Sequence, residues 1–399
     1  MKYAVVTFGC RVNQADSIAI EGQLRGRGAV SVPLDAADLV IVNTCSVTAS
    51  ADQGARQTIR RIARDNPDAR IVVTGCYATR RPDELRTLPN VVRVVSNTEK
   101  DNLVGLLDDS GDGPCGRAVE PGIAGRTALT LRVQTGCEER CSYCIIPQTR
   151  GPGRSLPQSL VIDRIHGAID AGYKEVVITG VHLGSYGRDL DDGTSLAMLV
   201  RRLAQWDKNV LFRLSSLEPM DCTDEIVDVV AGSERLAPHF HLPLQHGADS
   251  VLSNMRRPYT AAYFRRLVDR IHRVMPHAAI GSDLIVGFPG ETHDEFVATE
   301  RLLADLPLSH LHVFPYSDRP GTAASTMSGK VDGVIIRERG SRLRAIGREM
   351  SARFRREQQG TTRRALTVDD GRSAVTDNYV KIQLDRAYPR NEWISVTID

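Results

Sequence analysis

Three cysteines in the middle of the chain have a spacing that suits metal chemistry. They are Cys137, Cys141 and Cys144, and they directly follow an apolar stretch. Three thiolates on one loop can hold three irons of a [4Fe-4S] cube and leave the fourth iron open to a small molecule. A structural zinc site needs a fourth Cys or His nearby, and none follows in the next dozen residues. A zinc knuckle, or cysteines that are simply buried, are the alternatives to an open iron-sulfur cluster.

Three further cysteines, Cys10, Cys45 and Cys76, are far apart in the sequence but share a local context. Each comes directly after a run of apolar, strand-forming residues. If these strands are parallel, their carboxyl ends lie at one edge of the sheet, and the three thiols converge there. A single cysteine in such a place is usually a small packed side chain. Three cysteines that each follow a strand predict a second metal site. Because a fourth ligand is missing, an open [4Fe-4S] cube is favoured over a zinc site with four protein ligands.

The length and the net charge of the chain limit the class of protein. The chain has 399 residues, with 51 Lys and Arg against 49 Asp and Glu, and a formal net charge of +2. This length predicts two or three domains, and this charge neither requires nor excludes nucleic acid. The first residues do not resemble a signal peptide and no apolar run is long enough to span a bilayer, so we expect a cytoplasmic protein without membrane contact. In a reducing compartment, cysteines are more often ligands or catalytic thiols than disulfides.

The periodicity of apolar residues predicts an α/β protein with three parts. Residues 1–107 are expected to form a small α/β domain with a parallel sheet, and 108–126 a linker rich in Gly and Pro. Residues 127–345 repeat a strand-then-helix pattern, which predicts a partial TIM-type barrel with its functional groups at the carboxyl ends of the strands. The predicted strands are residues 3–7, 38–43, 70–74 and 91–95 in the first part, and 128–134, 174–179, 210–215, 239–244, 279–286 and 310–315 in the second.

Residues 346–399 are expected to hold a basic helix and a small all-β module. The helix is predicted over 335–364 and carries many arginines, which either form a solvated face or contact phosphates. The module is predicted from three β-like runs, 365–368, 379–384 and 393–398.

The first cysteine motif, with Tyr143 before its last cysteine, resembles that of the radical S-adenosylmethionine (SAM) superfamily. That resemblance implies that the open iron binds SAM and that Tyr143 lies near its adenine. Together with the three N-terminal cysteines, it is similar to the methylthiotransferase family over essentially the whole chain. The other segments that carry this resemblance are residues 43–48, 146–151, 180–187, 215–219, 241–245, 286–292 and 312–317.

The resemblance implies cofactors and partners. It implies two [4Fe-4S] clusters, with SAM as both methyl donor and radical source, and a low-potential electron donor such as flavodoxin or ferredoxin. The cluster at Cys10, Cys45 and Cys76 would present the sulfur, and we expect a monomer. Four residues would contact SAM, although Gly180 would equally serve as a turn and Glu218 as an ion-pair partner: Gly180, Ser216, Glu218 and Gln245.

The acceptor in this family is an adenosine beside the tRNA anticodon, carrying threonylcarbamoyl or isopentenyl, or an aspartate of a small-subunit ribosomal protein. Residues 7–14, 215–219 and 312–317 most resemble the enzymes that act on threonylcarbamoyladenosine, which predicts methylthiolation at C2 of that nucleoside (adenosine 37). Residues 245–249 depart from the family's usual Gln-Ser-Gly-Ser-Asp. A non-catalytic iron-sulfur RNA-binding protein is the rival from another class.

The C-terminal module resembles the RNA-binding TRAM domain but is shorter. The candidate RNA contacts are Arg150, Asn378, Tyr379 and Lys381, and an ordinary strand pairing is the alternative for the last two. Two cysteines, Cys115 in the linker and Cys222, match no ligand of the family.

Overall fold

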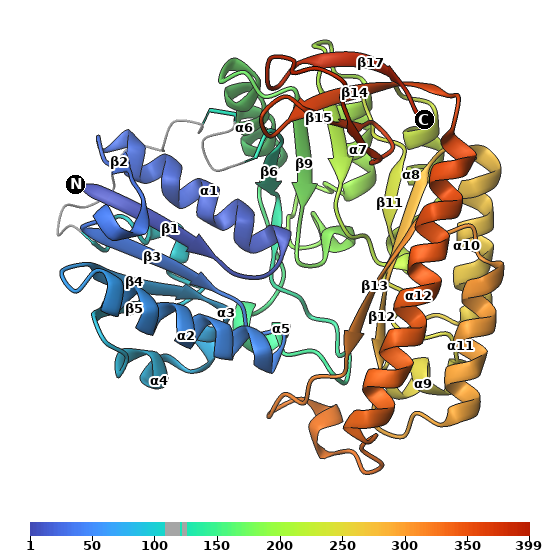
Figure 1. Cartoon of the computed structure of the whole chain (residues 1–399), viewed down its shortest axis with the longest axis horizontal. Helices are drawn as coiled ribbons and strands as arrows, with labels where there is room; N and C mark the ends of the chain where they lie inside the picture. The colour runs from blue at the N-terminus through green and yellow to red at the C-terminus, as the bar shows by residue number, and fades with distance from the viewer. Residues whose placement is uncertain (108–119, 122–125) are drawn as a thin grey trace.

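The computed structural model describes residues 1–107, 120, 121 and 126–399, and its parts pack side by side (Figure 1). The predicted linker, with Cys115, lies almost entirely outside the described residues. No helix in the described part of the chain combines the length and the apolar character that crossing a bilayer requires.

The N-terminal domain is a parallel five-stranded sheet with the order β2-β1-β3-β4-β5. The four predicted strands are confirmed, and a two-residue edge strand, β2, is added. Strand β3 is buried along its whole length because helices cover the sheet, which explains its continuous apolar run. The elements are β1 (Lys2–Thr7), α1 (Arg11–Gly26), β2 (Val30–Ser31), β3 (Leu39–Thr44), α2 (Ala49–Asp65), β4 (Arg70–Gly75), α3 (Cys76–Arg80), α4 (Pro82–Arg86) and β5 (Val91–Val95).

The second part is an open barrel of six parallel strands, as the sequence predicts. Its strands form two ladders, β6-β9-β10 and β11-β12-β13, which isolated bridges such as Ser216 to His241 connect. Helices cover the outside of the strands (Figure 1). The elements are β6 (Leu129–Arg132), β7 (Gln134–Thr135), α5 (Ile146–Arg150), β8 (Arg154–Ser155), α6 (Gln158–Asp170), β9 (Glu175–Thr179), α7 (Leu196–Ala204), β10 (Leu211–Leu214), α8 (Asp224–Ala231), β11 (His239–His241), α9 (Asp249–Asn254), α10 (Ala261–Val274), β12 (Ala279–Val286), α11 (His293–Asp305) and β13 (His310–Pro315).

One hydrophobic core joins the barrel strands to their helices, and it includes Leu343 and Met350 of the long helix α12 (Gly333–Gln358). The expected boundary between residues 345 and 346 therefore falls inside a continuous helix that packs on the barrel. The predicted end of this helix at residue 364 was wrong. Gly360 adopts a positive φ of 75°, which stops the helix.

The C-terminal module is a four-stranded antiparallel sheet with the order β16-β15-β14-β17. Three of its strands match the predicted runs, and the short polar strand β15 was missed. The module rests on the barrel, because the buried Arg213 of β10 donates a hydrogen bond to the carbonyl of Asp377 at 3.0 Å. The elements are β14 (Thr362–Val368), β15 (Ser373–Thr376), β16 (Lys381–Gln383) and β17 (Trp393–Thr397).

Candidate functional site

The loop that carries the central cysteines begins directly after β7. Gly136 has a φ of +77°, and a Cβ on it would lie 1.8 Å from the carbonyl oxygen of Pro152, so only glycine fits before Cys137. The amide of Cys144 donates to the carbonyl of Cys141 at 3.1 Å, which closes a turn. The hydroxyl of Ser142 donates to the carbonyl of Asn254 at 2.7 Å and ties the turn to the barrel. We call these three cysteines the loop trio.

Arg257 lies between the loop trio and Glu218. Its guanidinium donates to the sulfur of Cys141 at 3.1 Å and pairs with the carboxylate of Glu218. It also lies over the ring of Tyr259, at 5.0 Å from the centroid. Sequence reasoning named Glu218 but missed this buried arginine. The only local signal was the Arg256-Arg257 pair, which does not reveal what either side chain contacts.

A buried imidazole lies on the other side of the loop trio. His182 shares a 2.7 Å hydrogen bond between its Nε2 and a carboxylate oxygen of Asp221. Burial works against its protonation, but the interactions with Asp221 and Cys137 raise the pKa of His182 to about 10. The ring therefore carries a positive charge at neutral pH, next to Cys137. His182 lay in a motif that the sequence singled out, without a role assigned to it.

The residues expected to contact SAM differ in whether they line a cavity. Gly180 and Ser216 line a cavity of about 570 Å³ at the carboxyl ends of the barrel strands. Tyr143 is half-buried and packs with an apolar group that includes Phe288. Gln245 has an unusual φ of +71° and joins the strands through its backbone, and it does not line this cavity.

The N-terminal cysteines follow three neighbouring strands, β1, β3 and β4. Because the register pairs Thr7 with Asn43 and Thr44 with Gly75, the three chain segments leave the sheet at one edge. Cys45 and Cys76 are buried there, and Cys10 is exposed and lines the same cavity as Gly180 and Ser216. We call these three cysteines the strand-end trio.

Glycines again set the positions of two of these cysteines. Gly9 has a φ of +94°, and a Cβ on it would lie 2.7 Å from the sulfur of Cys45. Gly75 has a φ of +101°, and a Cβ on it would lie 2.2 Å from the carbonyl oxygen of Thr44. Such close approach of the backbone explains why glycine precedes the cysteine in both places.

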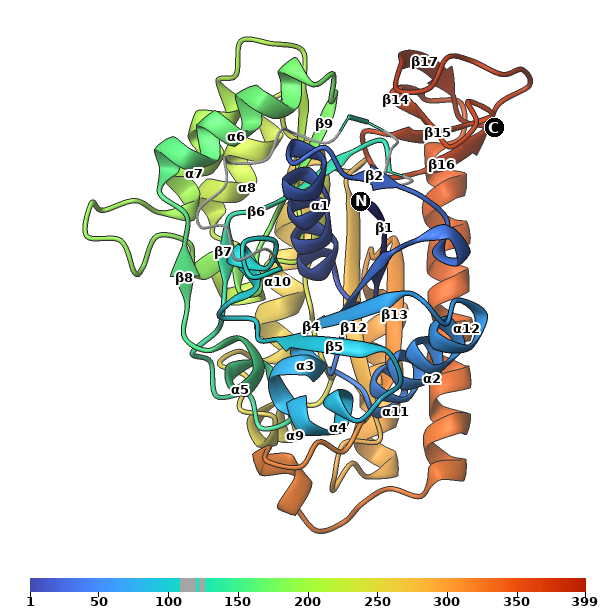
Figure 2. The same cartoon turned by 90° about the vertical axis from the view of Figure 1, so that its left-hand side faces the viewer.

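A buried ionic network joins the N-terminal domain to the barrel beside the strand-end trio. The two parts meet where α1 lies next to β6 (Figure 2). The fully buried carboxylate of Asp16 binds Lys100 at 2.9 Å, Arg150 at 3.0 Å and Arg132 at 2.6 Å. Asp101 is the second acid of the network and pairs with Arg132 at 2.6 Å. Burial alone would raise the pKa of Asp16, but the three cations outweigh it and lower the pKa.

This network has one more cation than acids, and the side chains of Cys10 and Cys76 lie next to it. Arg150 interacts electrostatically with both Cys10 and Cys76, and Lys100 with Cys76. A group that brings negative charge to the strand-end trio would therefore be stabilised. Arg150 itself is 2% exposed and binds Asp16, Asn13 and Thr135, so its side chain does not reach the surface in this structure.

The spacing of the thiols discriminates between a single ion and a larger core. With Zn–S bonds of about 2.3 Å, the thiolates on one zinc lie within roughly 4.6 Å of one another. Within the described residues, the cysteines do not form any group of three whose ligand atoms all lie within 4.8 Å. Among the described residues, neither trio therefore has the close thiol spacing of a preformed site for a single zinc ion.

Two of the thiols, those of Cys45 and Cys144, would not be ionised at neutral pH without a cluster. Burial raises the pKa of Cys45 and of Cys144 to about 12 each. Since thiolates are the ligands of iron, binding of a cluster must release these protons.

The remaining candidate RNA contacts differ in exposure. Asn378 is fully buried, and its amide donates to Gln358 and to the carbonyl of His277, both at 2.9 Å, so it cannot reach RNA in this structure. Lys381 is exposed and pairs with Asp369 at 2.8 Å. Tyr379 is 43% exposed and lines the 570 Å³ cavity beside Arg11. Cys222, which had no predicted role, belongs to the hydrophobic core of the barrel.

An open parallel barrel with three cysteines on the loop after its first strand defines a radical SAM enzyme. Residues 131–303 match the model of the Radical SAM superfamily, and residues 2–97 match the uncharacterized protein family UPF0004. The radical SAM methyltransferase TsrM of Kitasatospora setae has the same fold, with a TM-score of 0.58 at 17% identity, covering 81% of this chain and 76% of that chain.

Relatives that match over nearly the whole chain identify the family within this superfamily. A threonylcarbamoyladenosine tRNA methylthiotransferase MtaB of Bacillus subtilis is 35% identical, covering 94% of this chain and 88% of its own. One of Aquifex aeolicus is also 35% identical, covering 96% of each chain. A tRNA-2-methylthio-N(6)-dimethylallyladenosine synthase of Lawsonia intracellularis is 31% identical, covering 94% and 89%. The chain belongs to the radical SAM tRNA methylthiotransferase family.

Proposed function

We propose that this protein adds a methylthio group to C2 of N6-threonylcarbamoyladenosine beside the anticodon of tRNA. The observation that carries the proposal is the 35% identity, over nearly the whole chain, to relatives named for this substrate. Relatives named for dimethylallyladenosine match at 31–32%. The two cysteine trios and the shared cavity supply the chemistry that such a reaction needs.

In this proposal the loop trio holds one [4Fe-4S] cluster together with SAM, and the strand-end trio holds a second [4Fe-4S] cluster. When bound, these groups supply the carbon-centred radical, the methyl group and the sulfur. Glu218, Gly180, Ser216 and Tyr143 are the proposed SAM contacts. Arg257 positions Glu218, because the guanidinium binds its carboxylate and the sulfur of Cys141 together.

The cavity between the two sites is the proposed binding place of the target base. Cys10 lines it from the N-terminal domain, and Gly180 and Ser216 line it from the barrel. Its volume of about 570 Å³ is typical of a site that encloses most of a small ligand. A base in this cavity would lie beside Cys10 of the strand-end trio and beside Ile146, two residues after Cys144 of the loop trio. Binding there would exclude water from the reacting atoms.

The proposed partners follow from this chemistry. The loop trio needs a low-potential electron donor, such as flavodoxin or ferredoxin, and we propose a cytoplasmic monomer that engages tRNA. The exposed Lys381 and the arginines of α12 and β14 are the proposed phosphate contacts. Arg339 of α12 is not one of them, because it is buried against Glu291. We assign residues 1–107 to the auxiliary cluster, 127–345 to the radical SAM core and 346–399 to RNA binding.

Mass spectrometry of tRNA nucleosides from a deletion strain tests the function. We expect the methylthio form of threonylcarbamoyladenosine to disappear, the unmethylthiolated form to accumulate, and a plasmid copy of the gene to restore the wild-type pattern. A copy with Cys137→Ala is the matched control that should fail to restore it. Persistence of the methylthio form, or loss of the isopentenyl counterpart instead, would contradict the proposal.

A further inference from the structure

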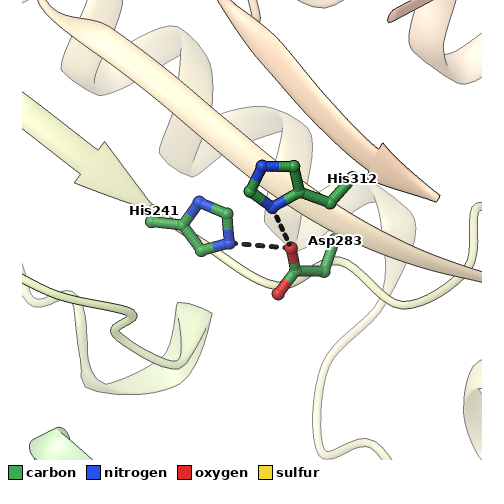
Figure 3. Close-up of side chains that lie close together, drawn as sticks. All are labelled: His241, Asp283 and His312. Atoms are coloured by element: carbon green, nitrogen blue, oxygen red, sulfur yellow. Dashed lines mark hydrogen bonds and ion pairs between the residues drawn. The ribbon is translucent and has the colours of Figure 1, made fainter. Parts of the chain in front are cut away.

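Three polar side chains meet on one wall of the 570 Å³ cavity, and no role has been given to them so far. His241, Asp283 and His312 come from the neighbouring strands β11, β12 and β13, where the register places Asp283 directly opposite His312. One oxygen of Asp283 lies 2.8 Å from Nε2 of His241 and 3.1 Å from Nδ1 of His312 (Figure 3). Each ring directs one nitrogen at Asp283 and turns the other away from it.

These contacts determine where the protons lie. Burial would raise the pKa of Asp283, but its hydrogen bonds to His241 and His312 outweigh this and lower the pKa. The same hydrogen bond to Asp283 raises the pKa of His312. The adjacent His310 is neutral, because burial and the neighbouring imidazoles lower its pKa to about 3. His312, whose side chain is 58% exposed, keeps its outer nitrogen free of Asp283, and its raised pKa favours the form in which that nitrogen donates.

Arg11 adds a second cation to the same wall. Its guanidinium donates to the hydroxyl of Tyr379 at 2.9 Å and lies over that ring. Among the described residues, Arg11 has no carboxylate within 4.0 Å, although it lines the cavity. When His312 is protonated, Arg11 and His312 against Asp283 leave one positive charge, which one carboxylate of a ligand would balance. We call Arg11, His241, Asp283 and His312 the polar wall.

Most of the remaining exposed lining of the cavity is apolar. Its apolar lining suits a planar aromatic base and contrasts with the polar wall. An aliphatic isopentenyl group would leave the charges of that wall without a partner, whereas a threonylcarbamoyl group ends in a carboxylate and carries N–H and hydroxyl groups. The apolar lining residues are Val12, Val47, Ile146, Val181 and Phe314.

We propose that the polar wall binds the carboxylate-bearing tail of the target nucleoside and so selects it over a nucleoside with an apolar tail. Arg11 and His312 donate to the carboxylate, and Asp283 is a positioning residue that orients both imidazoles. This inference rests on the proposed function and names the residues that determine its substrate.

A metal ion is the other occupant that this geometry admits, since two imidazoles and one carboxylate form a known ligand set. Two observations disfavour it. The nitrogens that would bind the ion are the ones that share protons with Asp283. Metal-binding imidazoles also donate their second N–H to a carboxylate or carbonyl, and within the described part of the chain neither His241 nor His312 does so.

The test compares the binding of three anticodon stem-loop RNAs to the cluster-loaded protein. One carries threonylcarbamoyladenosine, one carries the same group with its carboxylate converted to a neutral methyl amide, and one carries unmodified adenosine. Dissociation constants from fluorescence anisotropy give the preference for acid over amide. The variants are Arg11→Gln and His312→Gln, and the matched controls at exposed positions are Arg60→Gln and His293→Gln. Iron content is measured for each protein, because Arg11 is next to Cys10.

We expect the wild type and both controls to prefer the acid. Arg11→Gln and His312→Gln should each reduce that preference about tenfold, as expected for one charge-assisted hydrogen bond, and bind the amide unchanged. The inference is overturned if both variants keep the wild-type ratio, or weaken acid and amide equally, as a phosphate contact would. Metal beyond the cluster iron that His312→Gln removes would also overturn it. Failure of the wild type to methylthiolate the acid RNA would instead contradict the proposed function.

Discussion

The loop trio and the strand-end trio present the same three ligands in two different ways. The loop trio lies within eight consecutive residues, so a single turn, closed by the Cys144 to Cys141 hydrogen bond, holds it together. The strand-end trio depends on three strands and on the register that aligns their ends. Local chain geometry therefore determines the first site, and the topology of the sheet determines the second.

Both sites use a glycine with positive φ to aim a cysteine, but different cations surround them. Arg257 and His182 are the cations beside the loop trio. Lys100 and Arg150 lie beside the strand-end trio, and Arg150, together with Arg132, also holds the N-terminal domain to the barrel through Asp16. A change in the domain interface should therefore disturb the strand-end trio more than the loop trio.

Removing each trio should give the largest effect and separate the two roles. Replacing Cys137, Cys141 and Cys144 by Ala should abolish both SAM cleavage and methylthiolation, because SAM loses its binding place. Replacing Cys10, Cys45 and Cys76 by Ala should abolish methylthiolation and leave SAM cleavage. Chromatography of 5′-deoxyadenosine and of tRNA nucleosides measures both. Loss of SAM cleavage in the second variant would show that the sites are not independent.

Single glycine substitutions should break one site at a time. In Gly75→Ala the new Cβ meets the backbone of Thr44, and in Gly136→Ala it meets the backbone of Pro152, so in each case the main chain must move. We expect Gly75→Ala to lose iron from the strand-end trio and Gly136→Ala to lose it from the loop trio. Gly28→Ala is the control, since its φ is also positive but no atom lies within 4 Å of the added Cβ. Equal iron loss in all three variants would refute this local explanation.

Asp16→Asn should weaken the contact between the domains. Removing the acid from a buried network leaves its cations uncompensated, which typically costs about 3–5 kcal/mol. Chemical denaturation should show this loss relative to the exposed control Asp68→Asn. Iron bound by the N-terminal cysteines should fall more than iron bound by the central ones.

The same residue predicts a pH dependence with a defined sign. Because folding lowers the pKa of Asp16, its stabilisation is complete above the pKa of an unfolded aspartate, about 3.9, and is lost as the pH falls below it. Asp16→Asn should therefore flatten the acid side of the stability profile. An unchanged acid limb would mean that other carboxylates dominate there.

Arg257→Met should have a smaller and more specific effect. It removes the cation that holds Glu218, so we expect the affinity for SAM to fall about tenfold while iron binding persists. Equilibrium binding measures the affinity for SAM. The control is Arg256→Gln, which changes the exposed neighbouring arginine. Unchanged SAM affinity would remove Arg257 and Glu218 from the proposed SAM site.

Cys222→Ala should have the smallest effect. This buried cysteine belongs to the barrel core and not to either trio, so we expect a loss of about 1 kcal/mol and no change in iron. Loss of iron in this variant would contradict the assignment of six ligands.

The sequence predicts the parallel strands and the positions of the six cysteines because those signals are local. Runs such as residues 40–42 and 71–73 are apolar without a break, as buried parallel strands require. The C-terminal helix was predicted too long because the arginine-rich pattern continues past Gly360, although that glycine is the local signal for its end. These correct and incorrect predictions all concern the secondary structure of single segments of the chain.

The contacts that the sequence could not predict are those between segments. His182 meets Asp221 and Arg257 meets Glu218 only because separate barrel strands end near one another. Arg150 looks like a free cation in the sequence, but the docking of the N-terminal domain buries it against Asp16. Partners of this kind follow from the arrangement of the strands and domains, which residue types and spacing do not reveal.

Counting iron in the anaerobically reconstituted protein tests the central claim, that two independent trios each hold a four-iron cluster. Two such clusters predict roughly eight irons per chain, and about four in each of the two triple-alanine variants. Four irons or fewer in the wild type, or the loss of all iron from either variant, would contradict the account.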